Sequence, residues 1–280
     1  IPNIPANARW AQNGVTVAGG HGQGDATNQL NYPMGLFIDD DQTMVIADYY
    51  NHRIIQWKIG DKNGQVVAGG HGLGNRLDQL NVVRWSRRSG TTQGEILLDN
   101  IYGAELTTDD RGYLYISDTA KDEVIQYQIG RKNRTIVAGG NGQGAGLNQL
   151  NFPTFMFVDQ QQTVYVSDNR NHRVMKWDTG AKEGIVVVGG QGEGNALTQL
   201  SHPNGLLVDT LGTPYVVERG NNRVMRWPKG AKQGTVIVGG NGQGEQANQL
   251  NWPLGLSFDR QGNLYVVDHE NHRVQRFSIE

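Results

Sequence analysis

Three segments decide the fold: DNRNHRVMKW at 168–177, ERGNNRVMRW at 218–227 and DHENHRVQRF at 268–277. They are near copies of one another, and each begins 50 residues after the one before. Each combines an acidic residue, a polar turn containing Asn-His-Arg or Asn-Asn-Arg, and a run that ends in an aromatic residue. A pattern that recurs at a fixed period of this length indicates a repeat architecture.

The rest of the chain follows the same period. Gly-Gly pairs end at Gly20, Gly70, Gly140, Gly190 and Gly240, so all spacings are 50 residues except one of 70. Each regular unit holds four short runs rich in Val, Ile, Tyr and Phe, separated by Gly, Asp and Asn, which predicts four strands. No window carries a sustained helical period, so we expect an all-β chain. Four-stranded antiparallel units that repeat in this way are typical of a β-propeller.

The Asp-x-x-Asn-His-Arg-Val pattern at 168–174 and 268–274 resembles the NHL family. The start of each unit, such as PNGLLVD at 203–209, supports the resemblance, which covers nearly the whole chain. A kelch propeller also has Gly-Gly pairs and a similar period, but there a Tyr and Trp pattern follows the glycines. Here a glycine loop and Gln-Leu-Asn-x-Pro follow, so the resemblance implies an NHL-type propeller of four-stranded antiparallel blades.

The spacing of 70 residues marks an irregular second unit. Residues 82–100 align with 224–240 and look like the third and fourth strands of a blade without its first two. We therefore predict a six-bladed plan with an irregular second blade; a five-bladed ring with 82–100 as an excursion is the alternative. The strand Val15–Ala18 has no preceding strands of its own, so the N-terminus is expected to complete the last blade and close the ring.

We expect residues 1–280 to form a single propeller domain. Its units are 14–20 with 251–280, 31–70, 81–100 in part, 101–140, 151–190 and 201–240.

Composition gives few functional signals. Lys and Arg number 25 against 27 Asp and Glu, and the net charge of −2 provides no basic field for nucleic acid. There is no cysteine, hence no disulfide framework, and no apolar run approaches the ~20 residues of a membrane span. The sequon Asn133-Arg134-Thr135 favours an extracellular location, with a cytoplasmic one as the alternative. The chain begins at Ile1 without a methionine, so we expect part of a larger chain, or a monomer.

Most repeated residues are expected to be structural. The five glycine loops are not followed by a helix that could hold a phosphate, so we interpret them as turns between blades. The aspartates that end the first strands, such as Asp39, are expected to bond the backbone two residues on. The histidines of the Asn-His-Arg segments are expected to bond within their own blades, together with Asp48, Asp168 and Asp268. These histidines are His52, His172 and His272.

Positions where the units disagree are better candidates for a binding site. In a four-stranded blade the first strand lines the central channel. The loops that leave the fourth strand and those between strands two and three share one face, and such loops favour binding. The predicted binding residues are Tyr49, Tyr50, Glu105, Thr154, Asn169, Arg170, Asn204, Arg219, His269 and Glu270.

Three functions remain open. The first is a non-catalytic binding or scaffold propeller for a protein, peptide or glycan. The second is a metal-dependent lyase or hydrolase of the six-bladed type, with zinc or calcium on the channel axis. The residues expected at the starts of the first strands offer too few ligands for it, so we predict no catalytic residue, metal ligand or cofactor. The third is RNA binding, known among NHL domains, which the net charge disfavours.

Overall fold

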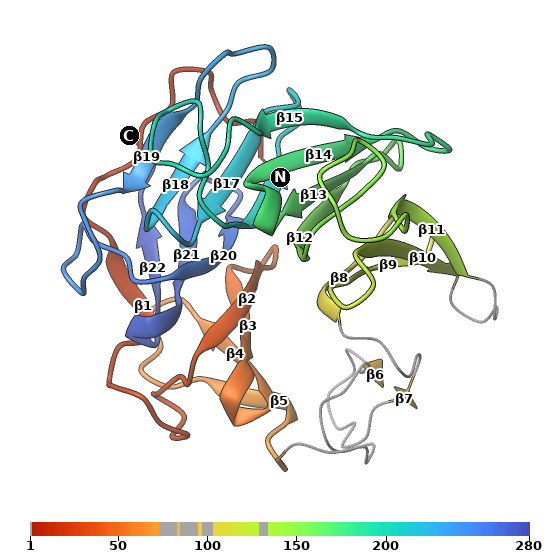
Figure 1. The fold of residues 1–280 in the computed structure, drawn as a ribbon. Helices are drawn as coiled ribbons and strands as arrows, with labels where there is room; N and C mark the ends of the chain where they lie inside the picture. Colours follow the sequence, from red (N-terminus) through yellow and green to blue (C-terminus); the bar gives the residue numbers. More distant parts are fainter. Residues whose placement is uncertain (1, 73–82, 85–94, 97–102, 129–133) are drawn as a thin grey trace. The chain divides into compact units, whose positions relative to one another are not determined.

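The computed structural model describes residues 2–72, 83–84, 95–96, 103–128 and 134–280 (Figure 1). These residues are all-β, and their helices are single 3-10 turns of three residues. None of these helices is long and apolar enough to cross a bilayer. The chain groups into two compact units, the first made of 1–2, 7–101 and 243–280 and the second of 3–6 and 102–242. The assignment of residues 1–280 to one domain stays a prediction.

The first unit contains two four-stranded antiparallel sheets. The 31–70 blade has the order β2-β3-β4-β5. Its elements are β2 (Pro33–Ile38), β3 (Thr43–Asp48), the 3-10 helix η1 (Tyr49–Asn51), β4 (Arg53–Lys58) and β5 (Gln65–Gly69). The second sheet, here called the terminal blade, has the order β1-β22-β21-β20. Its elements are β1 (Val15–Gly19), β20 (Pro253–Phe258), β21 (Leu264–Asp268), the 3-10 helix η3 (His269–Asn271) and β22 (Arg273–Phe277).

The second unit contains three more four-stranded antiparallel sheets. The 101–140 blade consists of β8 (Gly103–Thr108), β9 (Tyr113–Asp118), β10 (Glu123–Gln128) and β11 (Arg134–Gly139). The 151–190 blade consists of β12 (Pro153–Val158), β13 (Val164–Asp168), the 3-10 helix η2 (Asn169–Asn171), β14 (Arg173–Trp177) and β15 (Ile185–Gly189). The 201–240 blade consists of β16 (Pro203–Val208), β17 (Pro214–Glu218), β18 (Arg223–Arg226) and β19 (Thr235–Gly239).

The described residues therefore form five four-stranded propeller blades, the number of blades in the alternative prediction. The six-bladed plan is not confirmed. Within 82–100 the structure describes only β6 (Val83–Arg84) and β7 (Glu95–Ile96), which pair antiparallel as the predicted third and fourth strands would. The remainder of that segment lies outside the described residues. The expectation that the N-terminus completes the last blade is confirmed, because β1 pairs with β22 in the terminal blade.

In each of the two compact units, apolar side chains of the predicted strands are buried in a core. In the first unit, Leu30, Met44, Ile46, Trp57 and Tyr265 belong to one buried cluster. In the second unit, an equivalent cluster includes Tyr115, Leu150, Val166, Met175 and Trp177. Each large apolar side chain that leaves water in this way contributes about 1.5–3 kcal/mol. The packed strands hold the loops at their ends on a rigid frame.

The turns between the first and second strands form as the sequence predicts. Asp39 accepts a hydrogen bond from the backbone N–H of Asp41 at 3.0 Å and another from Thr43 at 2.8 Å. The same turn recurs at Asp109, Asp159, Asp209 and Asp259. The interpretation of these aspartates as turn residues is confirmed.

Candidate functional site

A buried carboxylate anchors the loop between the second and third strands. Asp48, at the end of β3, accepts hydrogen bonds from Arg53 Nε, Asn51 Nδ2 and the backbone N–H of Asn31, each at 2.7 Å. The pairs Asp168–Arg173, Glu218–Arg223 and Asp268–Arg273 repeat this arrangement. Buried charges must be paired and hydrogen-bonded in this way, so the aspartates bond within their blades as predicted.

The arginine of each pair also holds the glycine loop. Arg53 donates to the carbonyl oxygens of Asp25, Ala26 and Gln29. Asn51 donates to the carbonyl of Gly24 at 2.8 Å. The glycine loops and the Asn-His-Arg loops therefore lie together, as the sequence predicts.

The histidines of these loops do not follow the prediction. His272 Nδ1 accepts a hydrogen bond from the backbone N–H of Tyr32 at 3.2 Å, and His172 Nδ1 accepts one from His202 at 3.3 Å. Each partner belongs to the next blade, so the expectation of bonds within the blade is wrong for both. Both histidines have a left-handed backbone (φ 50° and 52°) that ends their 3-10 helix, and their rings contact the neighbouring blade.

Bonding through Nδ1 fixes the protonation of these rings. A nitrogen that accepts an N–H carries no proton, so the neutral tautomer with hydrogen on Nε2 is required. Burial lowers the pKa of both His172 and His272, which favours the same neutral form.

An aromatic cluster in the first unit gathers part of the predicted site. It comprises Tyr32, Tyr49, Tyr50, His269 and His272. Tyr50 lies 5.0 Å from Tyr32 and 5.1 Å from Tyr49 between ring centroids. Tyr32 lies 5.1 Å from His269 and 4.6 Å from His272. Tyr49 and Tyr50 remain 53% and 58% exposed, so both side chains are accessible to solvent while they contact other rings of the cluster.

Backbone and ring contacts fix this cluster. The N–H of Tyr50 donates to the Asn31 carbonyl at 3.1 Å, and His269 Nδ1 lies 2.9 Å from the Pro33 carbonyl. The predicted residues Tyr49, Tyr50 and His269 are thus brought together. Glu270 follows His269 in η3. The sequence prediction missed Tyr32, although an aromatic residue or His precedes Pro at that position in four of the sequence repeats.

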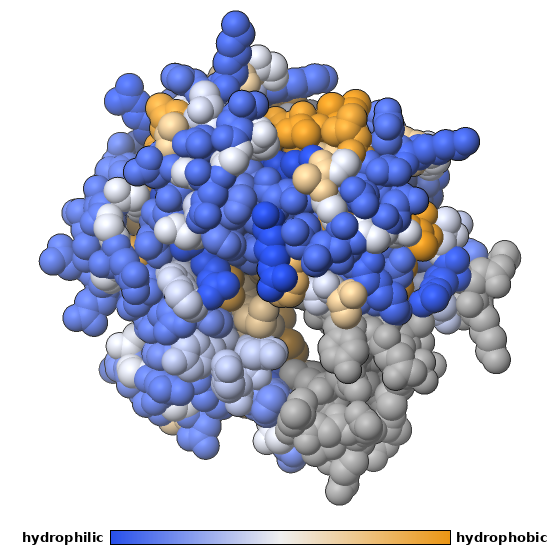
Figure 2. Space-filling model, in the orientation of Figure 1, coloured by the Kyte–Doolittle hydropathy of each residue, from blue (hydrophilic) through white to orange (hydrophobic). Residues whose placement is uncertain are grey.

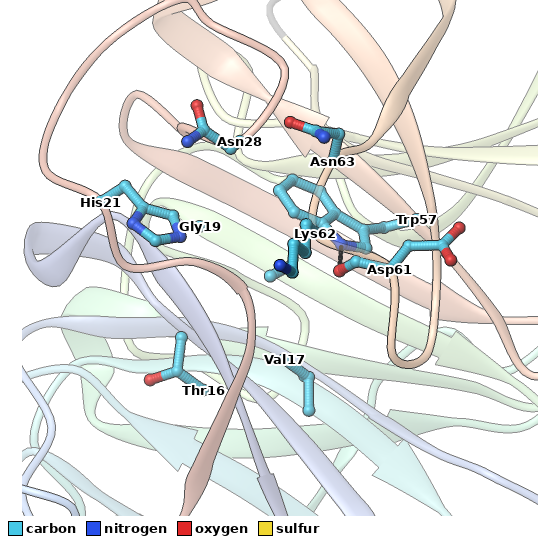
Figure 3. Close-up of a pocket in the computed structure, with 10 residues that line it drawn as sticks. Thr16, Val17, Gly19, His21, Asn28, Trp57, Asp61, Lys62 and Asn63 are labelled. Carbon is cyan, nitrogen blue, oxygen red and sulfur yellow. Dashed lines mark hydrogen bonds between the residues drawn. The ribbon is translucent and has the colours of Figure 1, made fainter.

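Two open grooves border the first unit. One of about 650 Å³ runs from Tyr50 along His52 and Arg53 to His71. The other, of about 550 Å³, lies between β1 and the turn after β4, with His21 and Lys62 among its lining residues. There the Trp57 indole donates to the Asp61 carbonyl at 2.9 Å (Figure 3). The first groove is the better candidate because it adjoins the aromatic cluster.

Several predicted residues in the second unit are buried and hold the backbone. Thr154 Oγ1 and Asn169 Nδ2 both donate to the Pro203 carbonyl, at 3.2 and 3.0 Å. Asn204 Nδ2 donates to the carbonyl of His202 at 3.0 Å. These three side chains hold the backbone at the strand starts, and their role in binding stays a prediction.

The other predicted residues of this unit have different surroundings. Burial raises the pKa of the Glu105 carboxyl to about 8, although Glu105 Oε2 accepts the Met156 N–H. The Arg170 guanidinium lies 4.5 Å from the centroid of the Phe152 ring, in a cation–π contact. The backbone N–H of Arg219 donates to the His202 carbonyl at 3.1 Å.

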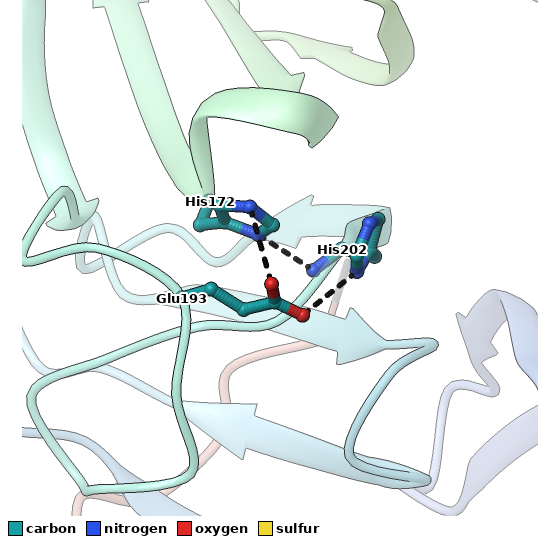
Figure 4. Close-up of side chains that lie close together, drawn as sticks. All are labelled: His172, Glu193 and His202. Carbon is teal, nitrogen blue, oxygen red and sulfur yellow. Dashed lines mark hydrogen bonds and ion pairs between the residues drawn. The ribbon is translucent and has the colours of Figure 1, made fainter.

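His172, Glu193 and His202 form a second polar cluster in this unit (Figure 4). Glu193 Oε1 lies 3.4 Å from His202 Nδ1, and Glu193 Oε2 lies 3.9 Å from His172 Nε2. Ser201 Oγ donates to Glu193 Oε1 at 2.8 Å. The sequence prediction missed this group, although Glu193 stands where three other glycine loops have Gln.

The face drawn in Figure 2 is mostly hydrophilic, with hydrophobic residues in small patches. The coloured, described residues therefore show no large apolar docking surface on this face.

The NHL repeat family model matches residues 250–277, which run from the end of a glycine loop through β22. The chain carries an NHL repeat. The NHL match covers the Asp268–Arg273 pair and the His272 acceptor described above. The resemblance seen in the sequence is thereby confirmed.

Several solved structures from Bacteroides species have a similar fold. A structural genomics protein of unknown function from Bacteroides thetaiotaomicron has a TM-score of 0.73 at 16% identity, covering 97% of this NHL-repeat chain and 77% of its own. Auxiliary nutrient binding proteins from B. thetaiotaomicron and B. ovatus have TM-scores of 0.67 and 0.68, both at 14% identity. These matches cover 98% of this chain, and 77% and 78% of the respective structures. No curated protein matches the sequence. At these identities the likeness shows the propeller fold alone.

Proposed function

We propose that this chain is a non-catalytic binding propeller that holds a neutral glycan on the aromatic cluster. The observation that carries the proposal is the exposure of Tyr49 and Tyr50 on a base of further rings. Aromatic faces carry partial negative charge, and the C–H faces of sugar rings carry partial positive charge, so the two stack. Tyrosine offers this area at low cost in side-chain entropy.

The surroundings of the cluster suit a sugar better than the other partners. The adjoining groove is open and has Asp25 and His71 among its lining residues, and both side chains are polar and can pair with hydroxyl groups. Arg53, the cation in that groove, is already bound to Asp48 and to backbone carbonyls, so it adds little attraction for RNA phosphates. Two structures of similar fold are described as nutrient binding proteins, which agrees with such a role. An extracellular or periplasmic location belongs to this proposal.

The test is binding to a panel of neutral polysaccharides by affinity electrophoresis, followed by calorimetry on the best ligand. Tyr50→Ala removes the ring that contacts both Tyr32 and Tyr49 and should weaken binding roughly tenfold, which corresponds to about 1.4 kcal/mol. Phe37→Ala is the matched control because it removes another exposed ring from the same blade. Failure to bind any glycan, or equal losses in the two variants, would contradict the proposal.

A further inference from the structure

The polar cluster of the second unit brings two imidazoles and one carboxylate to one place (Figure 4). Ligand atoms from His172, Glu193 and His202 all lie within 4.8 Å of one another. His172 comes from the loop after β13, Glu193 from the following glycine loop, and His202 from the start of the next blade. We propose that these three residues form a binding site for a divalent transition-metal ion of the zinc class.

Two of the three residues depart from the repeat. Glu193 stands where other glycine loops have Gln23, Gln143 and Gln243. His202 stands where other repeats of the sequence have Tyr32, Phe152 and Trp252. In the glycine loop before the 31–70 blade, Gln23 donates to Asn31, whereas here Glu193 accepts from Ser201. Both departures add a metal-ligating atom beside His172, a histidine that also occurs in other blades.

The donor set selects the class of metal. Two imidazole nitrogens and a carboxylate suit zinc and its neighbours, whereas calcium and magnesium prefer oxygen ligands alone. Zinc bonds of about 2.0–2.2 Å in a tetrahedron put ligand atoms about 3.4 Å apart. The 3.4 Å between Glu193 Oε1 and His202 Nδ1 already fits. The distance between Glu193 Oε2 and His172 Nε2 is longer, at 3.9 Å. The Glu193 side chain is 54% exposed and can move to shorten it.

A metal ion in this cluster would replace some of its present hydrogen bonds. A metal on His172 Nε2 requires the ring proton to move to Nδ1. The 3.3 Å contact from the His202 N–H must then open, so we expect micromolar affinity and loss of binding in acid.

The test uses the untagged full chain, zinc calorimetry and the visible spectrum of bound cobalt(II). We expect one equivalent to bind at pH 7.5. Glu193→Gln and His202→Phe each restore a residue that stands at the same position of another repeat, Gln143 and Phe152 respectively. Each should weaken binding by roughly tenfold or more and abolish the tetrahedral cobalt spectrum. His21→Asn, at an exposed loop position, is the matched control and should leave binding unchanged.

The proposal is overturned if neither ion binds at 100-fold excess over protein, or if both repeat-restoring variants bind like the parent chain. Thermal unfolding without metal checks that the variants fold. If His202→Phe does not fold, the metal binding of Glu193→Gln alone decides the test. Glycan binding measured with and without EDTA separates this site from the proposed function. The metal cluster lies in the second unit, whereas the aromatic cluster lies in the first.

Discussion

The Asn-His-Arg segment divides its contacts between two blades. Asp268 and Arg273 form a buried ion pair inside the terminal blade. The His272 ring instead contacts the 31–70 blade, where it accepts the backbone N–H of Tyr32. In the 101–140 blade Asp122 takes the place of the histidine and accepts the N–H of Phe152 at 2.7 Å. The shared requirement is therefore an acceptor at this position, which Asp also meets.

This role makes stability depend on pH through histidine. The pKa of His272 is lowered below the ordinary value of 6.5, so the unfolded chain takes up a proton before the folded one. The contribution is fully present above pH 6.5 and is lost as the pH falls through the folded pKa. We expect the urea midpoint to be constant from about pH 8 to 7 and to fall between about pH 6.5 and 5.

His272→Asn should reduce this slope because asparagine, the residue at the same repeat position in Asn222, can accept a hydrogen bond without titrating. His172 also has a lowered pKa, so part of the slope should remain. His21→Asn serves as the exposed control. A slope in His272→Asn equal to that of the parent chain would refute the assignment.

Residue roles were predictable where the partner is local in sequence. Asp39 bonds residues two and four positions on, and a turn of that kind can be predicted from sequence alone. The partner of His272 lies 240 positions away, so its role depends on how blades neighbour each other. The exposed rings of Tyr49 and Tyr50 were predicted because they differ between units. Thr154 and Asn204 also differ, but their polar atoms are used by the Pro203 and His202 carbonyls.

Among the elements, β1 shows how a strand is fitted into a sheet formed by the other end of the chain. Gly19 ends β1 with φ +68°, and a Cβ there would collide with the backbone carbonyl of His272. Gly22, three residues on, has φ +77° but no atom within 4 Å of such a Cβ. The two glycines share the left-handed conformation and differ in the space around them.

Gly19→Ala and Gly22→Ala separate these two effects. Gly22→Ala should lose about 1 kcal/mol from the free energy of unfolding, because alanine disfavours a left-handed backbone. Gly19→Ala should lose about 1–3 kcal/mol more, because the backbone of His272 must also move. Urea denaturation measures both. Equal losses would mean that β1 is held less closely against β22 than described.

Strand positions were predictable from the apolar runs and their fixed spacing. The apolar runs that precede the Gly-Gly pairs ending at Gly70, Gly190 and Gly240 form the fourth strands β5, β15 and β19. The number of blades was not predictable. The spacing of the repeats alone cannot distinguish a partial blade at 82–100 from an inserted loop. The pairing of β6 with β7 fits either.

At the scale of the molecule, the terminal blade is the sheet that joins the two ends of the chain. All the other repeats lie between these ends in the sequence. β1 pairs with β22 from Val15–Arg276 to Gly19–Arg273. The backbone N–H of Glu280 donates to the Arg9 carbonyl at 2.9 Å beside this ladder. Without β1, the edge of β22 would be open to pairing with other chains.

Deletion of residues 1–19 should therefore lower the denaturation midpoint and produce soluble oligomers. Size-exclusion chromatography with light scattering measures the second effect. Val15→Thr is the control, because this exposed position keeps its backbone bonds. A monomeric deletion variant of parental stability would show that the pairing of β1 with β22 contributes little.

The terminal blade also has a consequence for the history of such a chain. Its sheet takes one strand from the beginning and three from the end, so the repeat in the sequence and the blade in space are out of phase by one strand. A duplication or loss of one 50-residue segment between these ends would add or remove a complete blade and leave the joining sheet untouched. Gene rearrangement can therefore change the number of blades without breaking any sheet, and each new copy is then free to acquire its own loop residues, as the segment containing Glu193 and His202 has done.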